Sequence, residues 1–281
     1  MPAPRRWVHR HTSQLAVYGG MGLLSVIVLF PFYWMLIGST RATADLMAYP
    51  PHLTPGSQLV PNLQGLFATL PVLRAFANSL FVSTTHTTLV LFFCSLGGFG
   101  FAKYDFPGRD KLFLALLATM MIPGAIAIIP WYIMMTTFGW INDYKALIIP
   151  GSANAFGIFW MRQYVAASVP DELLQAARID GANDWGIYWR VVIPLIRPAL
   201  GTLGLLSFMW TWNDFMAPFI ILNDPEKFTL PLILGLLQNQ YGNNLNYIMT
   251  GAALATVPIL AVFIMMSRQF IGGLTAGALK G

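Results

Sequence analysis

Residues 169–183 have the sequence VPDELLQAARIDGAN, a polar, helix-forming stretch in a chain that is otherwise mostly apolar. Pro170 suits the first turn of a helix, where its missing N–H is not needed, and Asp171 and Glu172 favour the positive end of the helix dipole. Gly181 is typical of the position just past a helix end. Asn183 can then cap a second short helix. The stretch therefore predicts two helices joined by a turn, an elbow within residues 168–198.

Each helix of this elbow has a face set by the helical period. The first face combines two small side chains with a leucine and an aspartate: Leu173, Ala176, Ala177 and Asp180. The second face is largely aromatic and precedes a proline that stops the helix: Trp185, Tyr188, Trp189 and Val192, then Pro194. Such an elbow suits docking against another protein, and it suits equally a loop folded back on its own helices.

The elbow resembles the cytoplasmic loop of ABC importer permeases, which carry a Glu-Ala-Ala, three residues, Gly, nine residues, Ile-x-Leu-Pro pattern. Gln175-Ala176-Ala177, Gly181 and Val191-x-Ile193-Pro194 fill those places, with Gln175 where the family usually has glutamate. The likeness to the maltose-type, carbohydrate-importing branch includes further stretches: Ile179-Asp180-Gly181-Ala182, Pro198-Ala199-Leu200, Trp212-Asn213-Asp214-Phe215, Phe228-Thr229-Leu230-Pro231-Leu232 and residues 273–281.

The resemblance implies a non-catalytic permease subunit that moves a sugar or oligosaccharide by alternating access. Its implied partners are a second, non-identical permease subunit, two cytoplasmic ATPase subunits that bind ATP and Mg, and an external solute-binding protein. This chain would bind no cofactor or metal itself. The implied ATPase-coupling residues are Gln175, Ala176, Ala177, Asp180, Gly181, Trp185, Tyr188, Trp189 and Pro194. A similar tail reaches the ATPases in maltose-type permeases, which implies contacts by Thr275, Gly277 and Lys280.

The composition indicates an all-α, polytopic membrane protein. Of the 281 residues, 56% are hydrophobic and only 10% are charged, against about a quarter charged in soluble domains. The net charge of +5 comes from residues between apolar runs rather than from one basic stripe, so the lipid bilayer is the expected partner and nucleic acid is not. The single cysteine, Cys94, cannot form an internal disulfide.

Six apolar runs predict membrane spans, because about 20 apolar residues suffice to cross a bilayer: residues 15–37, 76–102, 112–136, 146–167, 199–222 and 248–267. With the elbow they form a transmembrane domain, residues 15–267, between an N-terminal segment 1–14 and a tail 268–281. Pro123 and Pro130 predict a bend in the third run. Arg162 in the fourth is expected to reach toward the membrane interface.

The placement of lysine and arginine predicts the orientation. With the N-terminus inside, inner segments carry twelve of the 16 basic residues, while outer loops carry only Arg41, Arg74, Lys145 and Lys227. This asymmetry follows the positive-inside rule. We therefore expect the elbow and both termini on the cytoplasmic side, and the resemblance implies that the membrane is the inner membrane of a prokaryote.

Asn213 and Asp214 form a polar pair inside the fifth apolar run. An aspartate at the membrane centre costs about 2.5–3.5 kcal/mol, so it should face protein or a water-filled path. With Trp210 nearby, Asn213 and Asp214 could bind a sugar. The sugar ring would stack on the indole, and its hydroxyls would form hydrogen bonds with the polar pair. We expect Trp210, Asn213 and Asp214 to line a substrate pathway. The alternative is a packing clasp, with Trp210 and Trp212 in an interfacial belt.

Two other classes of function stay open at this point. An intramembrane enzyme would use His86 and Asp214, which lie in different predicted spans, and a secondary carrier would need an internal repeat and more intramembrane charge. His86 is expected to be a neutral histidine bonded to a neighbouring helix. The sequence has no phosphate-binding loop pattern. The glycine-rich run Gly97-Gly98-Phe99-Gly100 lies at the end of a predicted span and therefore indicates close helix packing.

Overall fold

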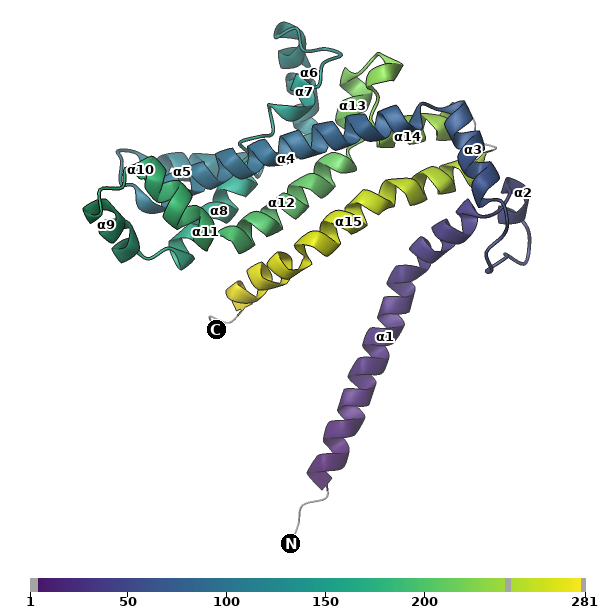
Figure 1. Cartoon of the computed structure of the whole chain (residues 1–281), viewed down its shortest axis with the longest axis horizontal. Coiled ribbons are helices and arrows are strands. Elements are labelled where there is room, and N and C mark those ends of the chain that lie inside the picture. The colour runs from purple at the N-terminus through teal and green to yellow at the C-terminus, as the bar shows by residue number, and fades with distance from the viewer. Residues whose placement is uncertain (1–4, 241–243, 279–281) are drawn as a thin grey trace. The chain divides into compact units, whose positions relative to one another are not determined.

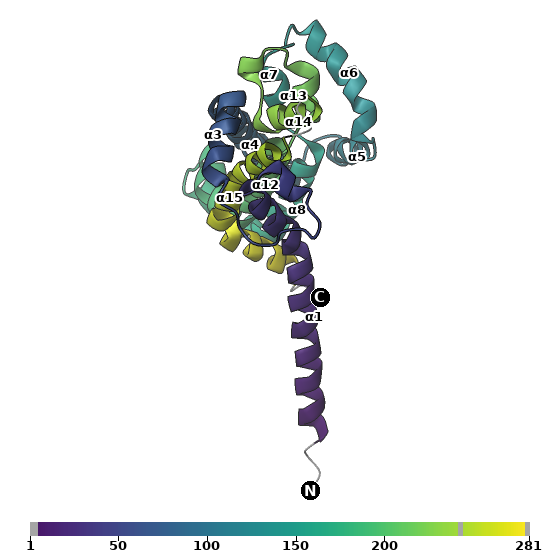
Figure 2. The ribbon, with the colours of Figure 1, turned by 90° about the vertical axis from the view of Figure 1, so that its right-hand side faces the viewer.

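The computed structural model describes residues 5–240 and 244–278, with side chains for residue 14, residues 17–237 and residues 244–266. Within these ranges the chain forms helices and turns and no strand (Figures 1 and 2). The all-α class expected from the composition is thereby confirmed. The chain divides into two compact units, residues 1–70 with 236–254, and residues 71–235 with 255–281.

The first unit is held together by a buried asparagine. Asn62 is 3% exposed, and its Nδ2 donates to the carbonyls of Ser39 and Arg41, both at 2.9 Å. Its Oδ1 accepts from Asn246 Nδ2 at 2.7 Å. These bonds satisfy polar groups that would be costly to bury alone. They join the elements of this unit: α1 (Arg5–Ser39), α2 (Thr43–Leu46), α3 (Leu59–Thr69) and the start of α15 (Leu245–Ala278).

The second unit is built on α4 (Val72–Lys103), which packs along α8 (Ala155–Ser168) and α12 (Arg197–Trp212). Two glycines bring α4 and α8 together. A Cβ on Gly98 would lie 2.5 Å from Met161 Cβ, and one on Gly157 would lie 2.6 Å from Cys94 Sγ. The close helix packing predicted from the glycine run is therefore confirmed at Gly98, whereas Gly100 has open space around it.

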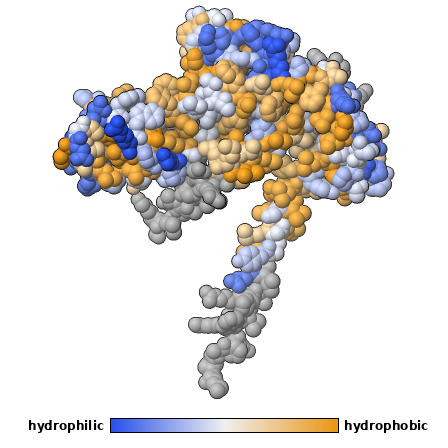
Figure 3. Space-filling view, in the orientation of Figure 1, coloured by the Kyte–Doolittle hydropathy of each residue, from blue (hydrophilic) through white to orange (hydrophobic). Residues whose placement is uncertain are grey.

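Short elements lie at the ends of this unit: α5 (Arg109–Thr119), α6 (Gly124–Thr137), α7 (Lys145–Ile148), α13 (Met216–Ile221), the 3₁₀ turn η2 (Pro225–Lys227) and the start of α14 (Leu230–Gln240). The Phe228–Leu232 stretch bonds to α4. Ser79 Oγ accepts from Leu230 N at 2.8 Å, and Asn78 Nδ2 donates to the Phe228 carbonyl at 3.0 Å. On the face shown in Figure 3, polar side chains gather at the top of the view and around the elbow at the left, and hydrophobic side chains predominate between them.

Three helical segments are long and apolar enough to cross a membrane: Val17–Ser39, Val72–Lys103 and Leu245–Met266. The number rises to five if two bent pairs each form one span. One such pair is α5 with α6, which meet at 101°; Pro123 precedes α6, so the bend predicted in the third run is confirmed. The fourth run, 146–167, is divided between α7 and α8, and α8 has only 14 residues. The count of six spans stays a prediction.

Arg162 does not point simply toward an interface. Its guanidinium lies over the ring of Phe113, 4.3 Å from the ring centroid, a cation–π arrangement. Its Nε is buried and forms no hydrogen bond within the described residues. The cation of α8 is thus placed against α5, and it links these two elements beside the elbow.

Candidate coupling elbow and membrane pocket

The first elbow helix, α9 (Asp171–Ile179), begins one residue later than predicted, because Pro170 is its cap residue with extended backbone (ψ 142°). Asp171 and Glu172 occupy the first turn, where negative charge is favourable. Asp171 also accepts from Lys103 Nζ at 2.6 Å. The Lys103 side chain is only 8% exposed, so this ion pair fixes the start of the elbow to the end of α4.

The turn at Gly181 has the geometry of a Schellman motif. Gly181 adopts a left-handed conformation (φ +82°), Gly181 N donates to the Arg178 carbonyl at 3.0 Å, and Ala182 N donates to the Ala177 carbonyl at 2.9 Å. This pair of bonds is the one that closes such helix ends. Asn183 Oδ1 then accepts from Gly186 N at 2.8 Å. The predicted glycine stop and asparagine cap are both confirmed.

The second helix differs from the prediction. It begins as α10 (Asp184–Ile187), widens into a π-helix, η1 (Tyr188–Val192), and ends as α11 (Ile193–Leu195). The physical reason is Pro194, whose ring would clash with the carbonyl of Arg190 in a regular α-helix. A π turn carries its bonds one residue further, as Ile193 N does to Tyr188 O. The helix therefore widens before Pro194 and ends one residue after it, at Leu195.

The widened turn separates the aromatic face that the helical period predicts to be continuous. Tyr188 and Val192 are buried, whereas Trp185 and Trp189 are about half exposed. Tyr188 reaches Ser95 of α4, with 2.7 Å between the hydroxyl oxygens, and Trp185 stacks on the Tyr188 ring. One part of this face therefore anchors the elbow to its own chain, and the other part is available to a partner.

The hydrophobic core of the second unit continues into the elbow. Leu174 of α9 and Ile187 of α10 belong to the same buried cluster as Val90 of α4 and Val165 of α8. Ala177 packs against the edge of this cluster, while Ala176 is exposed. The elbow is consequently an extension of the helix bundle and not a free loop.

A polar brace fixes the angle between the two elbow helices. Arg178 at the end of α9 pairs with Asp184 at the start of α10 at 3.5 Å, and its guanidinium lies 6.0 Å from the ring centroid of Tyr104. Burial and the nearby Asp184 carboxylate raise the pKa of the Tyr104 hydroxyl. Tyr104 therefore stays protonated and can donate a hydrogen bond where α4 ends.

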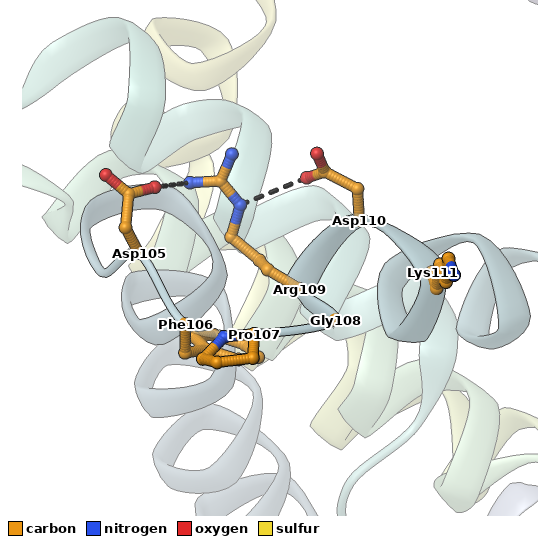
Figure 4. A pocket seen from close by; sticks show the side chains of 7 residues that line it. All are labelled: Asp105, Phe106, Pro107, Gly108, Arg109, Asp110 and Lys111. Carbon is orange, nitrogen blue, oxygen red and sulfur yellow. Dashed lines mark hydrogen bonds and ion pairs between the residues drawn. The ribbon is translucent and has the colours of Figure 1, made fainter.

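The loop between α4 and α5 encloses a shallow pocket of about 560 Å³ over residues 105–111. Figure 4 shows the Arg109 guanidinium between two carboxylates, at 2.5 Å from Asp105 and 3.0 Å from Asp110. Both acids raise the pKa of Arg109. Because these acids already pair with Arg109, the loop is better explained as a closed turn beside the elbow than as a ligand site.

The outer side of the elbow exposes apolar and small side chains. Ile179 is 87% exposed and Leu173 45%, and Gln175, Ala176, Asp180 and Gly181 are exposed as well. Large apolar side chains at such positions are uncommon on a free surface and often mark an interaction site. Seven of the nine coupling residues expected from the resemblance are exposed: Gln175, Ala176, Asp180, Gly181, Trp185, Trp189 and Pro194.

A second pocket, of about 530 Å³, lies in this unit beside α4 and α12. Its lining includes all three expected pathway residues together with His86 and Thr211: His86, Trp210, Thr211, Asn213 and Asp214. Apolar side chains of Leu147, Leu206 and Met209 complete it. The two titratable groups that belong to separate predicted spans therefore share one pocket.

The pocket forms where the fifth apolar run breaks. The helix expected over 199–222 ends as α12 at Trp212, and α13 begins at Met216. Asn213 Nδ2 donates to the Met209 carbonyl at 2.8 Å, and Asp214 Oδ1 accepts from Ala217 N at 3.3 Å. Asp214 thereby satisfies a backbone group at the start of α13, whereas Asn213 adds a second bond to a carbonyl that already accepts from Asn213 N.

The two tryptophans beside this pair have different surroundings. Trp210 is 56% exposed and lines the pocket. Trp212 is 1% exposed, stacks on Phe208 and donates from Nε1 to the Ala255 carbonyl at 3.0 Å. Trp212 is therefore part of the core and not of an interfacial belt.

Comparison with known proteins identifies this architecture. Residues 94–273 match the family described as binding-protein-dependent transport system inner membrane component. The chain belongs to this family. Its members are the permease subunits of ABC importers, which are transport components rather than enzymes. The matched range contains the elbow and the pocket residues Trp210, Asn213 and Asp214, whereas His86 lies before it.

Two permeases are similar in sequence to this chain over nearly their whole length. The arabinooligosaccharides transport system permease protein AraQ of Bacillus subtilis (strain 168) is 35% identical over 97% of this chain and 99% of its own. The lactose transport system permease protein LacG of Rhizobium radiobacter is 32% identical over 95% of this chain and 97% of its own.

The permease fold also matches solved structures. A bacterial ABC transporter involved in importing the acidic polysaccharide alginate has a chain with a TM-score of 0.81 and 23% identity, covering 96% of this chain and 100% of that one. A bacterial alginate ABC transporter in complex with an alginate pentasaccharide-bound periplasmic protein gives 0.62 and 17%, covering 92% and 95%. At these identities the likeness shows the fold alone.

The tail of the permease is only partly described. Helix α15 continues to Ala278, so Thr275 and Gly277 have helical backbone, but their side chains lie outside the described ones. Lys280 lies outside the described residues altogether. The expected tail contact with ATPase subunits therefore stays a prediction.

Proposed function

We propose that this permease imports a carbohydrate across the cytoplasmic membrane, driven by ATP hydrolysis on partner subunits. The substrate class is supported by the relatives, whose names refer to arabinooligosaccharides and lactose. The chain works beside a second, non-identical permease subunit, with two ATPases that hold ATP and Mg and with an external solute-binding protein. It contributes no cofactor or catalytic group of its own.

The observation that carries this proposal is the elbow, which is rigidly anchored inside and exposes apolar side chains outside. Its inner face joins the bundle core through Leu174, Ile187 and Tyr188, while Ile179 and Leu173 are exposed. A helix end of this kind fits into a groove on an ATPase subunit. Movement of the ATPases is then passed to α4, α8 and α12 as a rigid-body displacement, and the pathway opens alternately to either side.

Co-purification tests this proposal against an intramembrane enzyme and a secondary carrier. The tagged permease is expected to retain an ATPase subunit in stoichiometric amount, and ATP hydrolysis by the complex is expected to rise with carbohydrate-loaded binding protein. An enzyme or a carrier acting alone would retain no ATPase. A permease that purifies without any ATPase under mild detergent conditions would contradict the proposal.

A matched pair of variants locates the docking surface. Burying one isoleucine contributes about 1.5–3 kcal/mol, so Ile179→Asp is expected to lower ATPase retention at least about tenfold. Met47→Asp is the control, since Met47 is 71% exposed and lies after α2, far along the chain from the elbow. An equal loss of ATPase retention in both variants would indicate a general defect and would show that Ile179 does not lie in the interface.

The proposed orientation has its own test. With Cys94 replaced by alanine, single cysteines at Ser57 and Asn223 are expected to react with an impermeant thiol reagent in intact cells. Cysteines at Phe106 and Glu172 are expected to react only after permeabilisation. All four positions are exposed, so failure to react reports the side of the membrane. The opposite labelling pattern would reverse the orientation derived from lysine and arginine.

A further inference from the structure

We propose that the 530 Å³ pocket is a subsite for an uncharged sugar unit and that His86 is a sugar-binding residue in it. This inference depends on the proposed function, because it names the substrate class and one recognition residue of the import pathway. It stands on the chemistry of the five polar or aromatic residues that line the pocket.

The orientation of His86 is fixed by the neighbouring backbone. Its Nδ1 lies 2.9 Å from the Ile148 carbonyl oxygen. A carbonyl can only accept, so Nδ1 carries the hydrogen, and in the neutral imidazole Nε2 is then an acceptor. Gly151 leaves room for the ring, since a Cβ there would come within 2.8 Å of His86 Cε1. The bond to the neighbouring α7 thus fixes the ring at the pocket wall.

The polar atoms around His86 are mainly hydrogen-bond acceptors. Asn213 uses its amide nitrogen on the Met209 carbonyl, so its Oδ1 remains as an acceptor. Thr211 donates its hydroxyl to the Ser207 carbonyl at 3.0 Å, and Asp214 is a carboxylate. Sugar hydroxyls supply the donors that such a wall needs. Trp210 adds an indole ring on which an apolar sugar face can stack.

The charge of the lining selects between sugar classes. Asp214 is acidic, and neither lysine nor arginine is among the described residues that line the pocket. A uronic acid would bring a second carboxylate beside Asp214 without a lysine or arginine of the described lining to pair with it, which is unfavourable. The pocket therefore suits neutral sugars and disfavours acidic ones such as the units of alginate.

Two substitutions separate sugar binding from packing at His86. Asparagine can present an amide nitrogen near the position of Nδ1, so His86→Asn keeps the bond to Ile148 and removes the group at Nε2. Glutamine reaches the position of Nε2, so His86→Gln does the reverse. We expect His86→Asn to weaken sugar binding about tenfold, the value of one hydrogen bond, with an unchanged melting temperature. His86→Gln should bind within about threefold of wild type and melt at a lower temperature.

The measurement uses the complete membrane complex, purified with its partner permease and ATPases but without the solute-binding protein. Binding of radiolabelled arabinotriose, lactose, maltotriose and trigalacturonate is measured by scintillation proximity. We expect at least one neutral sugar to bind and trigalacturonate to bind at least about tenfold more weakly. Asp214→Asn should reduce this preference, because it removes the charge while keeping an acceptor for Ala217 N.

Different outcomes overturn different claims. Normal sugar binding by His86→Asn, or equal wild-type binding of neutral and acidic sugars, overturns the inference. Wild-type complex that binds none of the neutral sugars overturns it as well. Uptake of the same sugars by intact cells is measured in parallel. If ATP-dependent uptake occurs while the pocket variants behave as wild type, only the inference fails, whereas absence of any carbohydrate uptake contradicts the proposed function.

Discussion

Gly181→Val is expected to uncouple ATP hydrolysis from transport far more severely than Gln175→Ala. The backbone at Gly181 has φ +82°, a conformation in which a β-branched residue costs on the order of 1–3 kcal/mol. No atom lies within 4 Å of the place that a Cβ would take at Gly181, so the cost is conformational and not a clash. Relief of the strain would break both Schellman bonds and rotate α10 and η1, with the exposed Trp185 and Trp189, away from α9.

The comparison variants make this prediction specific. Gln175 is exposed on α9 and, as an uncharged donor and acceptor, contributes about 1 kcal/mol at most to a contact. Gln175→Ala should therefore reduce coupling mildly, and Gln175→Glu should be tolerated. Gly181→Asn should retain much of the coupling, because asparagine tolerates the left-handed region better than valine. The readouts are ATPase retention and stimulation by carbohydrate-loaded binding protein. If Gln175→Ala damages the complex as much as Gly181→Val, the elbow acts through a specific polar contact and the geometric account is wrong.

The second large effect is expected at Gly98. A side chain there would meet both Met161 Cβ at 2.5 Å and the backbone nitrogen of Arg162 at 2.7 Å. Backbone cannot move aside as a flexible side chain can, so α4 and α8 must separate. Overpacking of this kind costs about 1–3 kcal/mol for small insertions and more for large ones. Gly98→Val should therefore lower the melting temperature of the purified complex and its yield, with loss of transport as a consequence.

Gly100 provides the matched control on the same helix. A Cβ at this position would have no neighbouring atom within 4 Å, and alanine is a better helix former than glycine by about 1 kcal/mol. Gly100→Ala should leave melting and yield unchanged or raise them slightly. Equal damage at Gly98 and Gly100 would show that the α4–α8 contact does not determine the stability of the bundle.

The local features of the elbow could be predicted because their signals lie within a few residues. Gly181 and Asn183 specify a helix end and a helix cap by their own backbone and side-chain preferences. The π-helix at Tyr188–Val192 could not be predicted in the same way. The sequence shows Pro194 but not that Tyr188 will reach Ser95, 93 positions earlier, and that distant contact decides which aromatic side chains are buried.

The membrane pocket illustrates the same limit. Trp210, Asn213 and Asp214 stand out in the sequence because polar groups in an apolar run need a partner. His86 joins them only because α4 and α12 pack together, which no local pattern reveals. The break at Asn213 could not be predicted for a different reason: residues 199–222 are long and apolar enough to predict one span, while the helix ends where Asn213 and Asp214 bond to the backbone.

The α4–α8 contact also determines how far a motion can travel. Since Gly98 lets the two backbones touch and Lys103 ties α9 to the end of α4, the elbow cannot shift alone. His86 lies 17 residues before Lys103 on this helix, which makes a lever arm of roughly 25 Å at 1.5 Å per residue. A tilt of about 10° about the elbow would swing His86 through about 4 Å. Under the proposed function, a rotation of this size at the elbow would carry the whole pocket with it, because α4, α8 and α12 move as one body.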